Sequence, residues 1–197
     1  MLRILGISGS LREGSHNTNL LRAAAGELPP EVEFVIYDGL RELPPYDADR
    51  DLDGERADPA VAKLREAIAG ADGVVIATPE FNGSIPGVLK NALDWASRPF
   101  PDNSLRGKPV AVIGASTGLF GAVWAQAETR KVLGVIGADV IDRELPIGAA
   151  ETAFAGDGRL LDAEQHAALA NLVGVLAERA VAAGELGAGA GKLGAAA

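Results

Sequence analysis

Side chains that can donate hydrogen bonds to phosphate oxygens are gathered just behind the first apolar segment of the chain, residues 2–7. Three hydroxyls, a guanidinium and an amide are supplied by Ser8, Ser10, Arg12, Ser15 and Asn17. A helical pattern of apolar residues begins after Asn17. A strand, a loop of small residues and a helix in this order direct backbone N–H groups and the positive end of the helix toward an anion. The pattern therefore predicts a phosphate-binding loop, with an ordinary turn between strand and helix as the alternative.

The residue types in this loop restrict the class of phosphate ligand that it can bind. Neither the G-x-G-x-x-G fingerprint of dinucleotide sites nor the G-K-[ST] of a Walker loop is present in residues 8–17. Hydroxyl groups can surround a terminal phosphate monoester, whereas a bridging pyrophosphate requires the close approach of bare glycine backbone. The loop therefore favours a mononucleotide over a dinucleotide.

A second loop, residues 79–84, could supply a surface for a planar ring. It reads Pro-Glu-Phe-Asn-Gly-Ser and follows the apolar stretch 72–78. The aromatic face of Phe81, flanked by proline, amide and glycine, offers a flat wall together with backbone donors and acceptors. A fused ring with polar edges suits such a wall, although a plain turn with Phe81 in the core would use the same residues.

A third loop, residues 116–121, admits a different chemistry. The stretch Gly114–Gly118 matches the G-x-S-x-G nucleophile elbow, with Ser116 as the nucleophile. Asp142 or Asp157, with His166, could complete a triad in the required order. His166 falls in the first turns of a capped helix, where an exposed polar residue is ordinary, and short motifs often match by chance. A serine esterase therefore stays an alternative.

Strand and helix patterns alternate along the chain. Apolar stretches at 2–7, 32–37, 72–78, 108–115 and 138–141 predict five strands. Helices are predicted from Asp58-Pro59, from Pro86, over 122–133, and after Asp162 and Gln165, which form a capping box. This alternation predicts an α/β fold, a doubly wound five-stranded parallel sheet with helices on both faces. Ligands of such sheets bind beyond the carboxyl ends of the strands, where all three loops should meet.

Composition limits the classes of partner. The 197 residues suit one domain, which we expect to span residues 1–183, with residues 184–197 as a disordered Gly/Ala-rich tail. The net charge of −9 makes nucleic acid and anionic membranes poor partners. The absence of cysteine excludes thiolate catalysis and thiolate metal sites. With no apparent membrane span or signal peptide, a cytoplasmic protein is expected.

Three motifs carry a resemblance to a known family. They are Gly9-Ser10-Leu11-Arg12-x-x-Ser15-x-Asn17, the segment from Pro79 to Trp95, and Gly114-Ala115-Ser116. Together they closely resemble the NADPH-dependent FMN reductases, which are flavodoxin-like in fold, and the likeness covers about residues 1–183. Two positions depart from the pattern: Phe81 stands where tyrosine is usual, and Trp124 where many members have arginine.

The resemblance implies an FMN cofactor and a set of residues that hold it. It implies that the phosphate is bound by Ser10, Arg12, Ser15 and Asn17. It implies that one side of the isoalloxazine is bordered by Pro79, Glu80, Phe81, Asn82 and Gly83, and the other by Ser116 and Gly118. No catalytic side chain and no metal are implied, because the flavin carries the reaction.

The resemblance also implies an activity and an assembly. Members use NADPH or NADH to reduce quinones, flavins, chromate or azo dyes by ping-pong hydride transfer through FMN. They are homodimers or homotetramers, and the helix with Lys90, Asp94 and Trp95 is expected at the subunit contact. An electron-carrier flavodoxin is an alternative, although the threonine-rich phosphate loop of such carriers is absent. The sequence shows no arginine pair that marks a site for the 2′-phosphate of NADPH.

Overall fold

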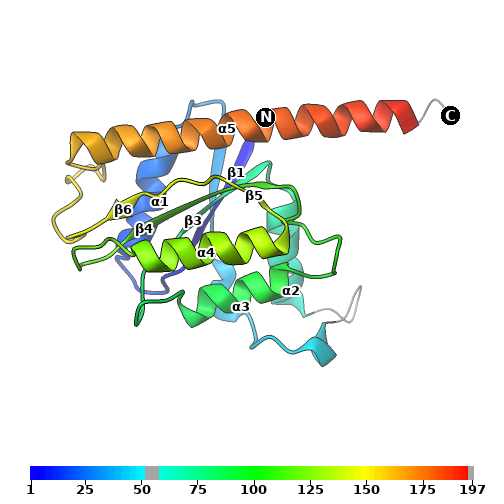
Figure 1. Ribbon diagram of the computed structural model, residues 1–197, viewed down its shortest axis with the longest axis horizontal. Helices are drawn as coiled ribbons and strands as arrows, with labels where there is room; N and C mark the ends of the chain where they lie inside the picture. The colour runs from blue at the N-terminus through cyan, green and yellow to red at the C-terminus, as the bar shows by residue number, and fades with distance from the viewer. Residues whose placement is uncertain (52–57, 195–197) are drawn as a thin grey trace.

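The computed structural model describes residues 1–51 and 58–194, with side chains described up to residue 186. Its centre is a parallel sheet in the order β2-β1-β3-β4-β5 (Figure 1). The strands are β1 (Arg3–Ser8), β2 (Glu33–Tyr37), β3 (Gly73–Ala77), β4 (Pro109–Ala115) and β5 (Asp139–Val140). This is the flavodoxin-like strand order, and it confirms the predicted fold class.

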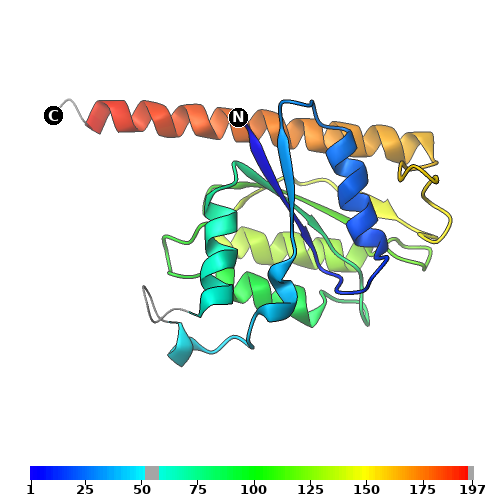
Figure 2. The same ribbon diagram turned by 180° about the vertical axis from the view of Figure 1, so that it is seen from behind.

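Among the described residues, five α-helices cover the two faces of the sheet. They are α1 (His16–Gly26), α2 (Pro59–Ala69), α3 (Gly87–Ala96), α4 (Val123–Ile136) and α5 (Ala163–Gly194), with the 3-10 turns η1 (Gly39–Glu42) and η2 (Ala48–Arg50) after β2. Side chains of α1 and α5 pack on one face with Val75, and those of α2, α3 and α4 pack on the other with Val74 (Figures 1 and 2). Neighbouring residues of β3 thus serve opposite cores, because successive strand side chains alternate between faces. All of β3 and β4 is buried, as expected for central parallel strands.

The predicted N-cap residues Asp58 and Asp162 each cap their helix. The Asp58 carboxylate accepts a hydrogen bond from the N–H of Ala60 at 2.9 Å, and that of Asp162 accepts one from Gln165 at 2.8 Å. Each satisfies a backbone donor that lacks a partner inside its helix.

One strand escaped the sequence analysis. The two residues of β6 (Pro146–Ile147) pair with Gly114 and Ala115 at the end of β4, whereas β5 pairs with its beginning. The charged residues between β5 and β6 interrupt the apolar pattern, so only the fully buried Ile147 marks the second piece. Because β6 runs along the carboxyl end of β4, it supports the loop that follows β4.

The last helix includes part of the segment that is expected to be a disordered tail. Helix α5 continues to Gly194 and extends beyond the body of the molecule (Figure 1). Alanine has high helix propensity, and extending a formed helix costs far less than nucleating one. The last well-buried residue is Ala180, so packing ends close to the predicted boundary even though the helix does not.

Helix α5 is also long and apolar enough to cross a membrane, judged by length and composition alone, over Ala163–Leu186. Its apolar residues have another use. Leu169, Leu172, Val173 and Leu176 are at most 2% exposed and pack against the sheet. This is the packing of a core helix.

Candidate functional site

The three loops predicted to converge do so at the carboxyl edge of the sheet, around a cavity of about 220 Å³. Eight of the eleven predicted site residues line it, and His16, Ala115 and Thr117 join them. The eight are Ser10, Arg12, Ser15, Asn17, Pro79, Glu80, Phe81 and Ser116. The other three predicted residues are turn residues at the edge of the same loops.

The start of α1 forms the anion-binding end of the cavity. Ser15 caps the helix, and its hydroxyl accepts a hydrogen bond from the N–H of Thr18 at 3.3 Å. In the part of the chain that the structure describes, the N–H groups of His16 and Asn17 have no acceptor. Free N–H groups in a first helical turn, next to the exposed guanidinium of Arg12, are a suitable donor set for a phosphate.

The side chain of Asn17, which is predicted to bind the phosphate, also joins two loops of the site. The amide is buried, donates to the carbonyl of Ala115 and accepts from the N–H of Ala115, both at 2.9 Å. It therefore ties the start of α1 to the end of β4 and fixes two site loops relative to each other. Its backbone N–H and the second N–H of its amide have no acceptor among the described residues, so both stay available to a ligand.

Residues 81–84 form a tight turn at one wall of the cavity. The N–H groups of Phe81 and Ser84 bond to each other's carbonyls at 3.2 Å. Asn82 and Gly83 have φ of 55° and 75°, the left-handed conformation that two-residue hairpin turns favour and that asparagine and glycine tolerate. These two residues are exposed and shape the turn, while Phe81, 56% exposed, offers its ring to the cavity and to solvent.

Two carboxylates fasten this turn to α4. Glu80 Oε2 accepts hydrogen bonds from the N–H groups of Trp124 and Ala125, both at 3.1 Å. Glu128 Oε2 accepts from the Ser84 hydroxyl at 2.6 Å and from the N–H of Ile85 at 3.3 Å. The hydrogen bond from Ser84 lowers the pKa of Glu128 below its ordinary value. Glu128 was missed by sequence analysis because it lies 44 residues from its partner.

The third loop is held by β6. The N–H of Ser116 bonds to the carbonyl of Ile147 at 3.0 Å, and the carbonyl of Gly118 accepts from Ala149 at 3.1 Å. Gly121 has φ of 56°, and a Cβ there would lie 2.5 Å from the backbone of Ile147, so the loop needs glycine at this point. The Ser116 hydroxyl accepts from the N–H of Gly118 at 3.1 Å. Gly118 therefore supports Ser116 and does not line the cavity.

The esterase hypothesis does not survive this geometry. His166 Nε2 lies 2.7 Å from a carboxylate oxygen of Glu27, just beyond the last turn of α1, whereas Ser116 shares its cavity with residues at the first turn of α1. The eleven residues of α1 put these ends about 16 Å apart. Asp157 is paired with Arg159 and Asp142 lies beside Arg130. The triad of Ser116 with His166 and Asp142 or Asp157 is therefore not formed.

The aromatic residues divide between the core and the site. Trp95 is 1% exposed, and its indole N–H donates to the carbonyl of Pro44 at 2.8 Å. It is a core residue of this chain, and the subunit contact expected for helix α3 stays a prediction. Trp124 is 52% exposed at the start of α4 and packs edge to face on Phe120, with ring centroids 5.1 Å apart.

The cavity fits a phosphorylated planar ligand such as FMN. At one end lie free N–H groups, hydroxyls and a guanidinium, and at the other the apolar faces of Pro79 and Phe81. Within the described residues, the N–H groups of Glu80 and Thr117 also have no acceptor, so both can donate to polar atoms at a ring edge. A flavodoxin-like sheet with such a site at its carboxyl edge defines a mononucleotide-binding protein of the flavodoxin type.

Comparison with known proteins takes this class to a family. Residues 2–152 match the family described as NADPH-dependent FMN reductase. The chain is 44% identical to an NAD(P)H-dependent FMN reductase of Pseudomonas aeruginosa over 82% of its length and 85% of that protein's. It is 41% identical to a quinone reductase of Escherichia coli over 72% of its length and 74% of that protein's. The chain belongs to the NADPH-dependent FMN reductase family.

A solved structure agrees with this assignment. The flavoenzyme NAD(P)H:(acceptor) oxidoreductase of Paracoccus denitrificans superposes with a TM-score of 0.78 at 34% sequence identity. The similarity covers 91% of this chain and 97% of that protein.

Proposed function

We propose that this protein is an FMN-dependent NAD(P)H oxidoreductase that reduces quinones or similar small acceptors. The observation that carries the proposal is the single cavity in which free N–H groups at the start of α1 lie across from the ring of Phe81. Membership of the family and the similarity to enzymes named FMN reductase and quinone reductase support it. Flavin mononucleotide bound there supplies hydride transfer in both halves of a ping-pong reaction.

The residues of this chain have positioning and electrostatic roles. We assign the flavin phosphate to Ser10, Arg12 and the N–H groups of His16 and Asn17, and the ring to the space between Phe81 and Ser116. The N–H groups of Glu80 and Thr117 are fixed dipoles that can stabilise negative charge developing on the ring. Phe81, half exposed, leaves one side of the cavity open to a flat donor or acceptor.

The test begins with the colour of the purified protein. We expect the visible absorption of an oxidised flavin, its loss when NADPH or NADH is added under argon, and its return on addition of 1,4-benzoquinone. A colourless protein that fails to bind added FMN at micromolar concentration would overturn the proposal.

Because NADPH and NADH are supplied in the cytoplasm, we also propose that the enzyme is cytoplasmic.

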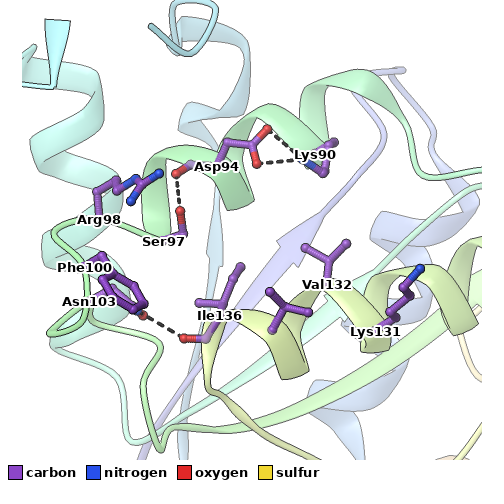
Figure 3. Close-up of a pocket in the computed structure, with 10 residues that line it drawn as sticks. Lys90, Asp94, Ser97, Arg98, Phe100, Asn103, Lys131, Val132 and Ile136 are labelled. Carbon is purple, nitrogen blue, oxygen red and sulfur yellow. Dashed lines mark hydrogen bonds and ion pairs between the residues drawn. The ribbon is translucent and has the colours of Figure 1, made fainter. Parts of the chain in front are cut away.

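We further propose that the enzyme is a homo-oligomer, assembled through a groove of about 350 Å³ between α3 and α4. Figure 3 shows Lys90 and Asp94 of α3 facing Lys131 and Val132 of α4 across this groove. Phe100 and Val135, also at the groove, are 70% and 80% exposed, which is unusual for large apolar side chains unless something covers them. This face also carries opposite charges, because Lys90 Nζ and Asp94 Oδ1 form an ion pair at 2.7 Å. A second copy that docks on it through the same face would therefore present both apolar and oppositely charged groups.

A further inference from the structure

A second cavity, of about 390 Å³, lies on the other side of the phosphate-binding loop. It is bounded by the loop between β1 and α1 and by the end of β2 with η1, which Figure 2 shows next to each other. The contact is direct, since Arg41 of η1 donates to the carbonyl of Leu11 at 2.8 Å. Only Ser10, Arg12 and their loop are shared with the candidate flavin cavity.

Three arginines from three different segments line this second cavity. Arg12 comes from the loop, Arg22 from α1 and Arg41 from η1. Their observed partners are uncharged: Gly14 carbonyl, Asn19 amide oxygen and Leu11 carbonyl. Over residues 1–51 and 58–194, no carboxylate lies within 4.0 Å of any of the three.

This concentration of positive charge is unexpected in an acidic protein. The chain has a net charge of −9, so carboxylates are plentiful as partners. Two of them, Glu13 and Asp38, do line the cavity, and Asp38 is at 4.0 Å from Lys63 instead. Three guanidinium groups therefore line the cavity with two carboxylates, and Arg22 and Arg41 stay available to a second ligand when Arg12 binds the flavin phosphate. A planar guanidinium group can donate two parallel hydrogen bonds to two oxygens of a phosphate.

The remaining lining residues fit an organic phosphate. The hydroxyls of Ser8 and Thr18 are 2.9 Å apart and bond to each other, while that of Ser10 stands at the boundary with the flavin cavity. Ile36 and Leu40 add apolar side chains to the lining of the cavity. A ligand with one phosphate monoester and an apolar or aromatic body would use both parts.

We propose that this cavity is a second anion site that binds a phosphate monoester, recognised by Arg22 and Arg41. This inference rests on the proposed function, in which NADPH or NADH is the electron donor. NADPH carries a phosphate monoester at the 2′ position of its adenosine, and NADH does not. An arginine near the 2′-phosphate is the usual means of telling the two apart. Free inorganic phosphate is the other source of the same chemistry.

The experiment uses the FMN-loaded protein and its Arg22→Gln and Arg41→Gln variants. Arg179→Gln is the matched control, because it removes one positive charge beside Asp139, at the start of β5 on the opposite edge of the sheet. Calorimetric titration is carried out with adenosine 2′-monophosphate, adenosine 5′-monophosphate and inorganic phosphate. We expect adenosine 2′-monophosphate to bind the unmodified protein and to lose about tenfold in affinity in each variant, since hydrogen bonds to charged groups contribute about 1.5–3 kcal/mol.

Kinetics supplies the second readout. The ratio of kcat/KM for NADPH to that for NADH should fall about tenfold in Arg22→Gln and Arg41→Gln and stay unchanged in Arg179→Gln. Binding of inorganic phosphate with an unchanged ratio would support the anion site and identify free phosphate as its ligand. The proposal would be overturned if both variants bound adenosine 2′-monophosphate as tightly as the unmodified protein. It would also be overturned if the variants lost affinity for FMN and kept their affinity for adenosine 2′-monophosphate. Failure of the proposed function looks different, because a flavin-free protein is colourless while its titration can still be read.

Discussion

The carboxylate of Glu80 accepts a hydrogen bond from the backbone N–H of Trp124 at 3.1 Å. The two residues lie 44 positions apart and join the loop after β3 to the first turn of α4. Helix α4 has no capping side chain of its own, since the residue before it is Ala122 in the left-handed conformation. Glu80 thus caps a helix from outside it, and the same bond attaches the loop that carries Phe81 to α4.

We therefore expect Glu80→Ala to cost about 1 kcal/mol of unfolding free energy, the usual effect of losing a helix cap. FMN affinity should fall as well, because the loop loses its anchor. Urea unfolding and fluorescence titration with FMN measure the two effects. Glu80→Gln, which keeps an acceptor oxygen, should recover most of both, and an alanine variant equal to the wild type in both would contradict the capping role.

The pKa of Glu128 gives the turn an acid-sensitive attachment. Its pKa is lowered by the Ser84 hydroxyl first and the Ile85 N–H second. A carboxylate with a depressed folded-state pKa adds stability above its unfolded-state pKa and loses it as the pH falls through the folded-state value. The stability difference between the wild type and Glu128→Gln should therefore be present at neutral pH and vanish in acid. Parallel unfolding curves at pH 7 and pH 3 test this, with Ser84→Ala reducing the same difference.

The raised pKa of the Tyr37 phenol predicts that the folded state loses stability at alkaline pH. Burial, helped by Glu42 and Asp38, raises the pKa of its phenol to about 12. The folded state therefore favours the protonated form, so the stabilisation is complete below pH 10 and is lost as the pH rises from about 10 toward 12. Its hydroxyl has no hydrogen-bond partner among the described residues. Tyr37→Phe should be no less stable at pH 7 and should flatten the alkaline decline in melting temperature, and an unchanged decline would refute this assignment.

Arg12 offers a test of the phosphate end of the site. Arg12→Ala should weaken FMN binding tenfold or more, since a hydrogen bond to a charged group contributes about 1.5–3 kcal/mol. Riboflavin lacks the phosphate, so its affinity should not change. Titration of the flavin-free protein with each compound separates the two cases, and Arg179→Ala controls for the loss of charge. Equal losses for FMN and riboflavin would place Arg12 elsewhere in the site.

The parts of the site that could be predicted from the sequence are those that depend on residues close together in the chain. Ser15 caps the helix that begins one residue later, and the Asn82-Gly83 turn needs only its own backbone preference. The order of strands and helices likewise follows from local patterns combined with the handedness of crossovers. Eight site residues came together at one cavity because all three loops follow adjacent strands.

What sequence analysis missed depends on pairs distant in the chain. Asn17 has the chemistry of a phosphate ligand, and only its bonds to Ala115, 98 residues away, show that its side chain also joins α1 to β4. The same holds for Arg22 and Arg41, which no spacing rule pairs, because η1 approaches α1 only once β2 lies beside β1. Spacing finds the groups that can act, and the fold decides which of them are free to act.

The groove between α3 and α4 gives the last prediction. If a second copy covers the groove, the burial of Val135 stabilises the assembly through its apolar area. A charged side chain at this position would remove that stabilisation. Val135→Glu should therefore shift the protein toward the monomer, as measured by light scattering coupled to size exclusion. Leu161→Glu is the control, because Leu161 is 64% exposed and lies outside the groove. An unchanged mass for Val135→Glu would exclude this face from the assembly, whereas a monomeric variant that keeps its flavin would show that the site is complete within one chain.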